Sequence, residues 1–213
     1  MEALADRIDA LLPQTQCARC GYPDCRAYAE AVAKRETGFN RCPPGGEATL
    51  SALAGLLNQP LRPMDPAVGE FAPGTVAFIE EPLCIGCTKC IAACPVDAIT
   101  GAQKQMHTII EALCTGCGLC LPPCPVDCIR LTPAQGVTEG FEGWQFPMAG
   151  SERAEALRSR YAVFMQRQAR NKTQRQDKAE KTERDLKSHH QAEIAAAVAR
   201  VKAKRAVQAK KPR

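Results

Sequence analysis

The cysteines constrain this fold more than any other feature of the sequence. The chain has 13 of them in 213 residues, and eight fall into two copies of one spacing, C-x2-C-x2-C-x3-C followed by proline. The first copy comprises Cys84, Cys87, Cys90 and Cys94, and the second comprises Cys114, Cys117, Cys120 and Cys124. Cysteines this numerous and this regularly spaced indicate a fold organised around metal or disulfide chemistry.

The sequence around the two motifs is itself repeated with a period of 30 residues. Residues 83–100 align with 113–130, and 10 of the 18 positions are identical. A short β-prone run precedes each copy, at 76–79 and 108–110, and another ends each copy. Because a duplicated strand–loop–helix–strand unit can bury its two halves against each other, we expect a small α+β domain with pseudo-twofold symmetry over residues 75–132.

The spacing of the two motifs is that of bacterial ferredoxins, in which three cysteines of one motif and the fourth of the other ligate each [4Fe–4S] cluster. Two-residue gaps let a tight loop wrap three iron corners of a cube. Gly86 and Gly116 lie inside these loops, where backbone amides must approach the sulfurs. The predicted ligand sets are Cys84, Cys87, Cys90 and Cys124 for one cluster, and Cys114, Cys117, Cys120 and Cys94 for the other. The alternative is a pair of zinc sites, which three thiolates from one crowded loop disfavour.

A third group of cysteines lies near the N-terminus, in a segment that the apolar spacing predicts to be helical. Its members have the spacing C-x2-C-x4-C-x16-C: Cys17, Cys20, Cys25 and Cys42. Three of these ligands come from one loop, which favours a third [4Fe–4S] cluster and leaves structural zinc as the alternative. Tyr22 lies within that loop and is interpreted as a lid over the site or a redox-active residue. We expect residues 1–60 to form a small helical domain, with Asp24 capping one helix, and the proline-rich residues 61–74 to form a linker.

Cys128 is the one cysteine left outside these groups, and it occupies the position of Ala98 in the first repeat. We interpret it as a small buried thiol. A substitute ligand or redox sensor is the alternative. His107, on the β-prone run between the repeats, is expected to be a partly exposed side chain and not a ligand.

Charge divides the chain into an acidic body and a basic tail. Residues 1–150 carry 10 Lys and Arg against 16 Asp and Glu, whereas residues 151–213 carry 18 against 7. All the cysteines lie in the acidic part. We expect residues 151–213 to form a long solvated helix, broken near His189-His190 and fraying by Pro212. Residues 133–150 contain Phe141, Trp144 and Phe146, which we expect to pack this connecting segment on the ferredoxin domain.

Several classes of protein are excluded or disfavoured by what the sequence does not contain. It has no apolar stretch near the roughly 20 residues of a membrane span, no signal peptide, no glycine-rich phosphate loop and no recognisable catalytic set. A cytoplasmic location keeps thiols reduced and favours metal over disulfides. Nucleic-acid binding by the tail is disfavoured because the tail has few aromatic residues for base stacking and seven interspersed acids.

The runs CARCGYPDCRAYAEAVAKRE and CPPGGEATLSAL, followed by the two-motif module with CPVDCI, resemble the B subunit of the Rnf (Rsx) electron transport complex over about residues 1–132. The resemblance implies three [4Fe–4S] clusters and an electron relay, without a substrate site of its own, in a redox-driven ion-translocating membrane complex. Its partners would be redox proteins, chiefly other subunits. Members commonly begin with a membrane-anchoring helix, and this sequence starts almost at the first cysteine motif.

Without that anchor, we expect a peripheral protein on the cytoplasmic face of the inner membrane, tethered through residues 151–213 to anionic lipid or an acidic protein surface. A soluble polyferredoxin serving a cytoplasmic oxidoreductase is the first alternative. A nucleic-acid-associated iron–sulfur protein is the second.

Overall fold

The computed structural model describes residues 2–69, 75–133 and 151–209. The chain divides into two compact units, Met1–Phe164 and Met165–Arg213. Within the described ranges, no helix combines the length and the apolar character that crossing a bilayer requires.

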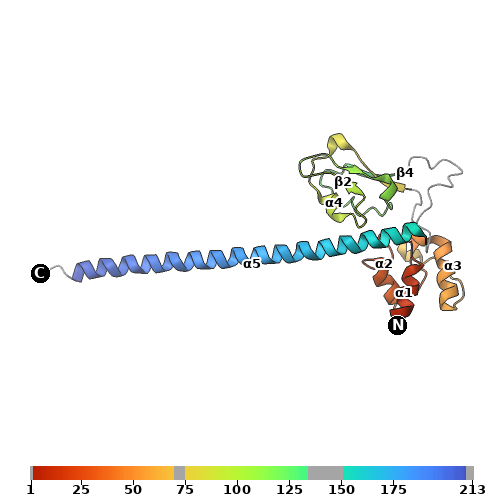
Figure 1. Ribbon diagram of the computed structural model, residues 1–213, viewed down its shortest axis with the longest axis horizontal. Helices are drawn as coiled ribbons and strands as arrows, with labels where there is room; N and C mark the ends of the chain where they lie inside the picture. The colour runs from red at the N-terminus through yellow and green to blue at the C-terminus, as the bar shows by residue number, and fades with distance from the viewer. Residues whose placement is uncertain (1, 70–74, 134–150, 210–213) are drawn as a thin grey trace. The chain divides into compact units, whose positions relative to one another are not determined.

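Three helices surround the N-terminal cysteines: α1 (Glu2–Ala10), α2 (Cys25–Ala33) and α3 (Gly46–Leu57). Helices α1 and α2 pack against each other (Figure 1). The predicted cap of α2 is confirmed, since the Asp24 carboxylate accepts a hydrogen bond of 2.7 Å from the amide of Ala27. Ile8, Tyr28 and Leu53 are fully buried in one core with Cys20, Cys25 and Cys42, so the apolar faces of the helices meet around sulfur.

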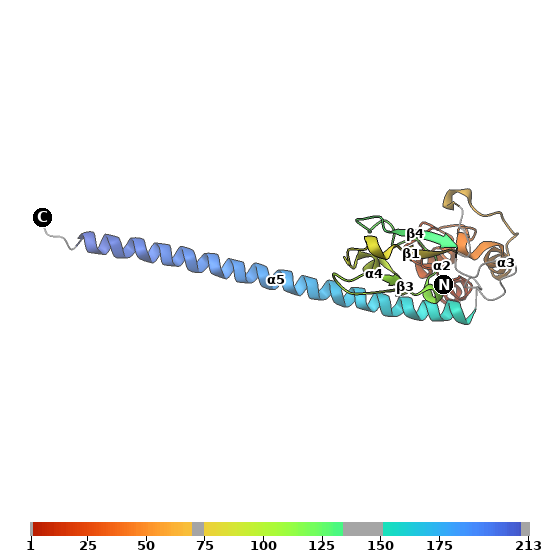
Figure 2. The ribbon, with the colours of Figure 1, turned by 90° about the horizontal axis from the view of Figure 1, so that it is seen from above.

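The repeated region folds into two small antiparallel sheets. The elements are β1 (Thr75–Ile79), α4 (Lys89–Ala93), β2 (Ile99–Thr100), β3 (Thr108–Ile109) and β4 (Ile129–Pro133). Strand β1 pairs with β4 (Figure 2), with Ile79 opposite Ile129. Strand β2 pairs with β3. A short 3-10 turn precedes each cysteine motif. The pairing joins the strand before the first motif to the strand after the second, and so confirms an α+β arrangement of two interlocked halves.

The core of this α+β region is rich in sulfur and small side chains. Six of its buried members are cysteines: Cys90, Cys94, Cys114, Cys120, Cys124 and Cys128. The remainder are mainly valine, isoleucine and alanine, such as Val96 and Ile99. A core of this size with so few large side chains buries little apolar area, which leaves its stability dependent on whatever the sulfurs bind.

Helix α5 (Glu152–Ala209) is 58 residues long, and its first turns belong to the first unit. Leu157 is buried in the α+β core. Arg158 forms an ion pair of 2.9 Å with Asp9 of α1, and the Arg160 guanidinium donates a hydrogen bond of 2.7 Å to the carbonyl of Val96. The start of α5 therefore contacts both cysteine-rich parts of the first unit.

The second unit is the rest of α5, and its described side chains are almost all exposed. The predicted break near His189-His190 is wrong, because the helix runs through these residues without interruption (Figure 1). The physical reason is the absence of Gly and Pro there, together with i,i+4 ion pairs such as Lys187–Glu183 at 2.6 Å. The expected packing of Phe141, Trp144 and Phe146 and the expected fraying at Pro212 concern residues outside the described ranges.

Candidate metal centres

A narrow cavity in the α+β region is lined by four thiols. They belong to Cys94, Cys114, Cys117 and Cys120. Cys94 ends the first motif and the other three belong to the second, so this group matches one of the two ligand sets expected from the spacing. The walls between the sulfurs include Ala77 and Ala98. The amide of Ala77 donates to the Cys114 sulfur at 3.3 Å, and the amide of Ala98 donates to the Cys94 sulfur at 3.2 Å.

These four thiols influence one another's pKa values. Burial, and then the neighbouring thiolates of Cys117, Cys114 and Cys94, raise the pKa of Cys120 to about 12. Burial likewise raises the pKa of Cys117 to about 11, with smaller contributions from Cys94 and Cys114. Four thiolates would repel one another in this cavity unless a cation compensated their charge.

The other cysteines of the two motifs form a second group. Burial raises the pKa of Cys90 to about 11, and the neighbouring Cys87 and Cys84 add to the shift. The Cys124 sulfur lies 3.5 Å from the sulfur of Cys128. The charge of Cys84 is in turn one of the causes that raise the pKa of Cys128. Cys84 and Cys124, from opposite motifs, are therefore both near Cys128.

The N-terminal cysteines form a third group. Burial, followed by the charge of Cys17 and a smaller contribution from Cys20, raises the pKa of Cys42 to about 12. Burial and then Cys42 raise the pKa of Cys25 well above its ordinary value. The hydroxyl of Tyr28 accepts a hydrogen bond of 3.1 Å from the amide next to Cys42, that of Arg41. Tyr22, the expected lid, packs on Tyr28 with ring centroids 5.7 Å apart.

The donor chemistry fits a thiolate-bound metal better than thiol catalysis. Buried thiols with raised pKa values stay protonated near neutral pH, and protonated thiols are weak nucleophiles. A metal that displaces those protons supplies the positive charge the thiolates need. Among the described residues, no three His, Cys, Asp or Glu side chains converge closely enough to hold one metal ion. A [4Fe–4S] cube binds each thiolate at a different iron, and a cavity with four sulfurs in its walls suits that requirement.

The loop glycines allow close backbone packing. Gly86 and Gly116 have φ values of +66° and +64°. A Cβ atom on Gly86 would overlap the backbone of Gln105, and one on Gly116 would overlap the backbone of Thr75. These glycines therefore let the ligand loops lie directly against neighbouring chain, a contact that the sequence alone did not identify.

The expectation that His107 is partly exposed is wrong, because only 1% of its surface is accessible. Its Nδ1 atom lies 3.3 Å from the Cys90 sulfur, and its Nε2 atom lies 3.3 Å from the carbonyl oxygen of Ala102. The chain turns at Gly101, where a Cβ atom would overlap the imidazole ring, and this turn creates the space for the ring. The interpretation of Cys128 as a buried thiol is confirmed.

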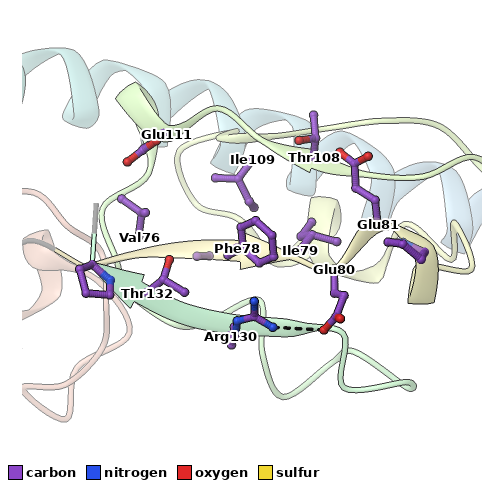
Figure 3. A pocket seen from close by; sticks show the side chains of 13 residues that line it. Val76, Phe78, Ile79, Glu80, Glu81, Thr108, Ile109, Glu111, Arg130 and Thr132 are labelled. Atoms are coloured by element: carbon purple, nitrogen blue, oxygen red, sulfur yellow. Dashed lines mark hydrogen bonds and ion pairs between the residues drawn. The ribbon is translucent and has the colours of Figure 1, made fainter. Parts of the chain in front are cut away.

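The wider hollows of the first unit lie away from the thiols. A groove of about 540 Å³ runs along β1 and β4, and none of the residues that line it is a cysteine (Figure 3). In this groove Arg130 forms an ion pair of 3.1 Å with Glu80, and its guanidinium lies 4.7 Å from the centre of the Phe78 ring. The chemistry of the thiols is therefore located at the narrow cavity and not in the open groove.

Comparisons with known proteins agree with this donor chemistry. A family model described as "4Fe-4S dicluster domain" matches residues 77–131, and one described as "Putative Fe-S cluster" matches residues 12–44. Together with the thiol-lined cavity, these matches define the class as an iron–sulfur protein with a dicluster ferredoxin-type domain.

Curated relatives identify the family within that class. The chain is 52% identical over 153 residues to the B subunit of the ion-translocating oxidoreductase complex of Azoarcus sp. (strain BH72), covering 72% of this chain and 83% of the relative. It is 54% identical over 153 residues to the protein of the same name from Alkalilimnicola ehrlichii, covering 71% of this chain and 80% of the relative. The chain belongs to the family of B subunits of the ion-translocating oxidoreductase complex.

Other relatives match over a shorter span. The protein of the same name from Thiobacillus denitrificans is 63% identical over 107 residues, which are 50% of this chain and 57% of the relative. The chain thus spans little more than half the length of several of its relatives.

Proposed function

We propose that this protein is an electron-transfer subunit that relays single electrons through three [4Fe–4S] clusters in an Rnf-type ion-translocating oxidoreductase complex. The observation that carries the proposal is the cavity whose four thiols come from both cysteine motifs. The proposed ligands are Cys17, Cys20, Cys25 and Cys42 for the first cluster, Cys84, Cys87, Cys90 and Cys124 for the second, and Cys94, Cys114, Cys117 and Cys120 for the third. A bound [4Fe–4S] cluster supplies reversible one-electron chemistry.

The residues of the chain hold and insulate these centres. Each cysteine sulfur provides one soft ligand, and backbone amides such as those of Ala77 and Ala98 donate hydrogen bonds to ligand sulfurs. Burial of the thiols limits the access of water, which lowers the local dielectric constant and helps to set the reduction potential. Electron transfer at these sites needs no bond making by the protein, so the chain requires no substrate pocket.

The direct test is metal and sulfide analysis of anaerobically purified full-length protein, combined with electron paramagnetic resonance (EPR). Three clusters require about twelve irons and twelve sulfides per chain, by the four-iron, four-sulfide composition of each cube. About eight irons with one zinc would contradict the N-terminal cluster, and zinc throughout would contradict the function.

Crossed ligation has its own matched test. Cys94→Ala should remove the cluster of the second motif, to which it supplies the fourth ligand, and leave the cluster of the first motif in place. Cys128→Ala should keep the full iron content, because Cys128 is not a proposed ligand. Loss of the first-motif cluster in Cys94→Ala would refute crossed ligation.

We further propose that α5 tethers the protein to the cytoplasmic face of a membrane, beside the other subunits of its complex. Residues 165–213 carry 15 Lys and Arg against 5 Asp and Glu. The described side chains of this part are almost all exposed, and the apolar ones, such as Ile194 and Val198, are few. Clustered basic residues each contribute about 1 kcal/mol near an anionic lipid surface, so electrostatics alone can hold such a helix there.

The tether is tested by deleting residues 165–213, which keeps the first turns of α5 with the first unit. Cluster content should be unchanged. Binding to vesicles with anionic lipid should fall, and binding of the intact chain should weaken as salt increases. Equal vesicle binding by the truncated chain would refute the tether. Tighter retention of the tail by DNA than by anionic vesicles would favour the nucleic-acid alternative.

A further inference from the structure

Two side chains contact ligand sulfurs of the same proposed cluster. His107 Nδ1 lies 3.3 Å from the sulfur of Cys90, and the Cys128 sulfur lies 3.5 Å from the sulfur of Cys124. Cys90 and Cys124 come from different motifs, but both are proposed ligands of the second cluster. The inference drawn from these contacts rests on the ligand sets of the proposed function.

The contact made by His107 is built into the fold. The ring is 1% exposed, and its other nitrogen lies 3.3 Å from the carbonyl oxygen of Ala102. Gly101, at a φ of +145°, turns the chain so that the ring fits where any Cβ atom would overlap it. A buried imidazole held on both sides has little freedom to turn away from the sulfur.

The pseudo-twofold symmetry of the repeat shows what stands at the corresponding places around the third cluster. Hydrogen bonds confirm that the period of 30 extends through the strands. The amide of Glu80 donates to the carbonyl of Cys128, and the amide of Ile110 donates to the carbonyl of Ala98, at 2.8 and 2.7 Å. Gly86 and Gly116 likewise pack against backbone atoms of Gln105 and Thr75, residues that are 30 positions apart.

By this symmetry, the counterpart of His107 is Ala77, and the counterpart of Cys128 is Ala98. Both alanines line the cavity of Cys94, Cys114, Cys117 and Cys120. Their backbone amides donate to sulfur, but their methyl side chains have no polar hydrogen. The side-chain donors His107 and Cys128 are therefore present at one site and replaced by methyl groups at the other.

The third cluster has one side-chain donor that the second cluster lacks. Thr115 stands where the first repeat has Ile85, and its hydroxyl reaches the sulfur of Cys117. That hydroxyl also lies 3.4 Å from the carbonyl oxygen of Thr15, which competes for its single proton. The neutral His107 ring likewise has a single N–H for two acceptors, the Cys90 sulfur and the Ala102 carbonyl. The second cluster thus has two side-chain donors, His107 and Cys128, and the third cluster has one, Thr115.

A sulfur bonded to iron carries no proton, so a hydrogen bond across these contacts must come from the N–H of His107, in the tautomer with its proton on Nδ1, and from the S–H of Cys128. Hydrogen bonds to ligand sulfurs stabilise the reduced cluster, which is the more negative state, and raise its reduction potential. We propose that His107 and Cys128 make the cluster at Cys84, Cys87, Cys90 and Cys124 the higher-potential member of the pair, so that an electron entering this domain comes to rest there.

With both clusters bound, one electron would pass from the reduced third cluster to the oxidised second cluster, with no bond formed or broken. His107 and Cys128 are positioning residues in this step. They act through Cys90 and Cys124 and hold no iron themselves.

The test is an EPR-monitored redox titration of the full-length, anaerobically purified protein and six variants. His107→Ala and Cys128→Ala each convert the second site to its counterpart, and Ala98→Cys performs the reverse exchange at the third site. The signal that disappears in Cys94→Ala identifies the third cluster. In the double variant His107→Ala/Cys128→Ala, we expect the reduction potential of the second cluster to fall. The ratio of electron occupancy between the two clusters should change at least tenfold, which corresponds to 59 mV for one electron.

Ala98→Cys should instead raise the reduction potential of the third cluster. His107→Gln keeps an N–H donor, so the potential of the second cluster should fall less in this variant than in His107→Ala. Iron and sulfide content should stay at the value of the unmodified protein. In the reduced protein, proton couplings that exchange in D2O should be present and should disappear with each donor.

Unchanged potentials in both single variants, or equal shifts of both clusters, would overturn the inference. If His107→Ala loses a cluster outright, Cys128→Ala and Ala98→Cys still decide the question, since each changes only one small side chain. Absence of [4Fe–4S] signals from the unmodified protein would instead refute the proposed function, so the two failures are distinguishable.

Discussion

The hydroxyl of Tyr28 supports the loop that carries Cys42, and removing it should loosen the N-terminal site. The ring is 1% exposed. Its hydroxyl donates to the carbonyl of Gly38 and accepts from the amide of Arg41, both at 3.1 Å. Tyr28→Phe keeps the packing of the ring and leaves these two backbone groups without that partner. Each lost hydrogen bond costs about 0.5–1.5 kcal/mol, so we expect a loss of about 1–3 kcal/mol in local stability.

At about 1.36 kcal/mol per factor of ten, this loss corresponds to a local opening that is roughly 5 to 150 times more frequent. The assay is amide hydrogen exchange at residues 38–42 of the metal-loaded protein, together with the rate at which a chelator removes iron from the N-terminal site. Tyr22→Phe is the matched control, because it removes the hydroxyl of the neighbouring, partly exposed ring. Equal exchange rates in Tyr28→Phe and Tyr22→Phe would refute the reasoning.

Three other perturbations have defined outcomes. Cys20→Ala should destabilise residues 1–60 and remove the N-terminal cluster while the other EPR signals remain; unchanged melting of this region without its metal would contradict a structural role. Gly86→Ala should cost more than Gly46→Ala in chemical denaturation. Both glycines have positive φ, which costs a non-glycine residue about 1–2 kcal/mol of folding free energy. Only at position 86 would the added Cβ atom also overlap backbone atoms. Metal-free protein should lose stability as pH rises from 9 toward 12, because burial raises the pKa of Cys42 and Cys120 from 9.0 to about 12 in the folded state. Circular dichroism across that pH range measures the loss, and a flat profile would show that these thiols titrate alike in both states.

Much of the local structure could be predicted because it depends on neighbours in sequence. The Asp24 cap needs only its own carboxylate and an amide three residues later. The duplication of 83–100 in 113–130 indicates two interlocked halves, because neither half can bury its apolar side chains alone. The ligand sets follow from the same reasoning, and they stay a prediction until metal is measured.

Where the residues outside the motifs lie could not be predicted in the same way. Nothing in the composition of the β-prone run around His107 distinguishes a buried imidazole from an exposed one. Its burial depends on the turn at Gly101, which brings the ring to Cys90, 17 residues earlier in the chain. The helix break expected at His189-His190 was wrong because histidine is a poor but tolerated helix residue, and neighbouring ion pairs compensate for it.

Which atoms can bind metal is already specified in the amino-acid sequence, since the number and spacing of thiols are properties of the covalent chain. What surrounds each thiol depends on the folded structure. The two repeats share their cysteines, yet folding places His107 and Cys128 beside the sulfurs of Cys90 and Cys124, whereas Ala77 and Ala98 line the cavity of the other group. A hydrogen bond depends on distances of about 3 Å between residues remote in the chain, and packing alone fixes such distances.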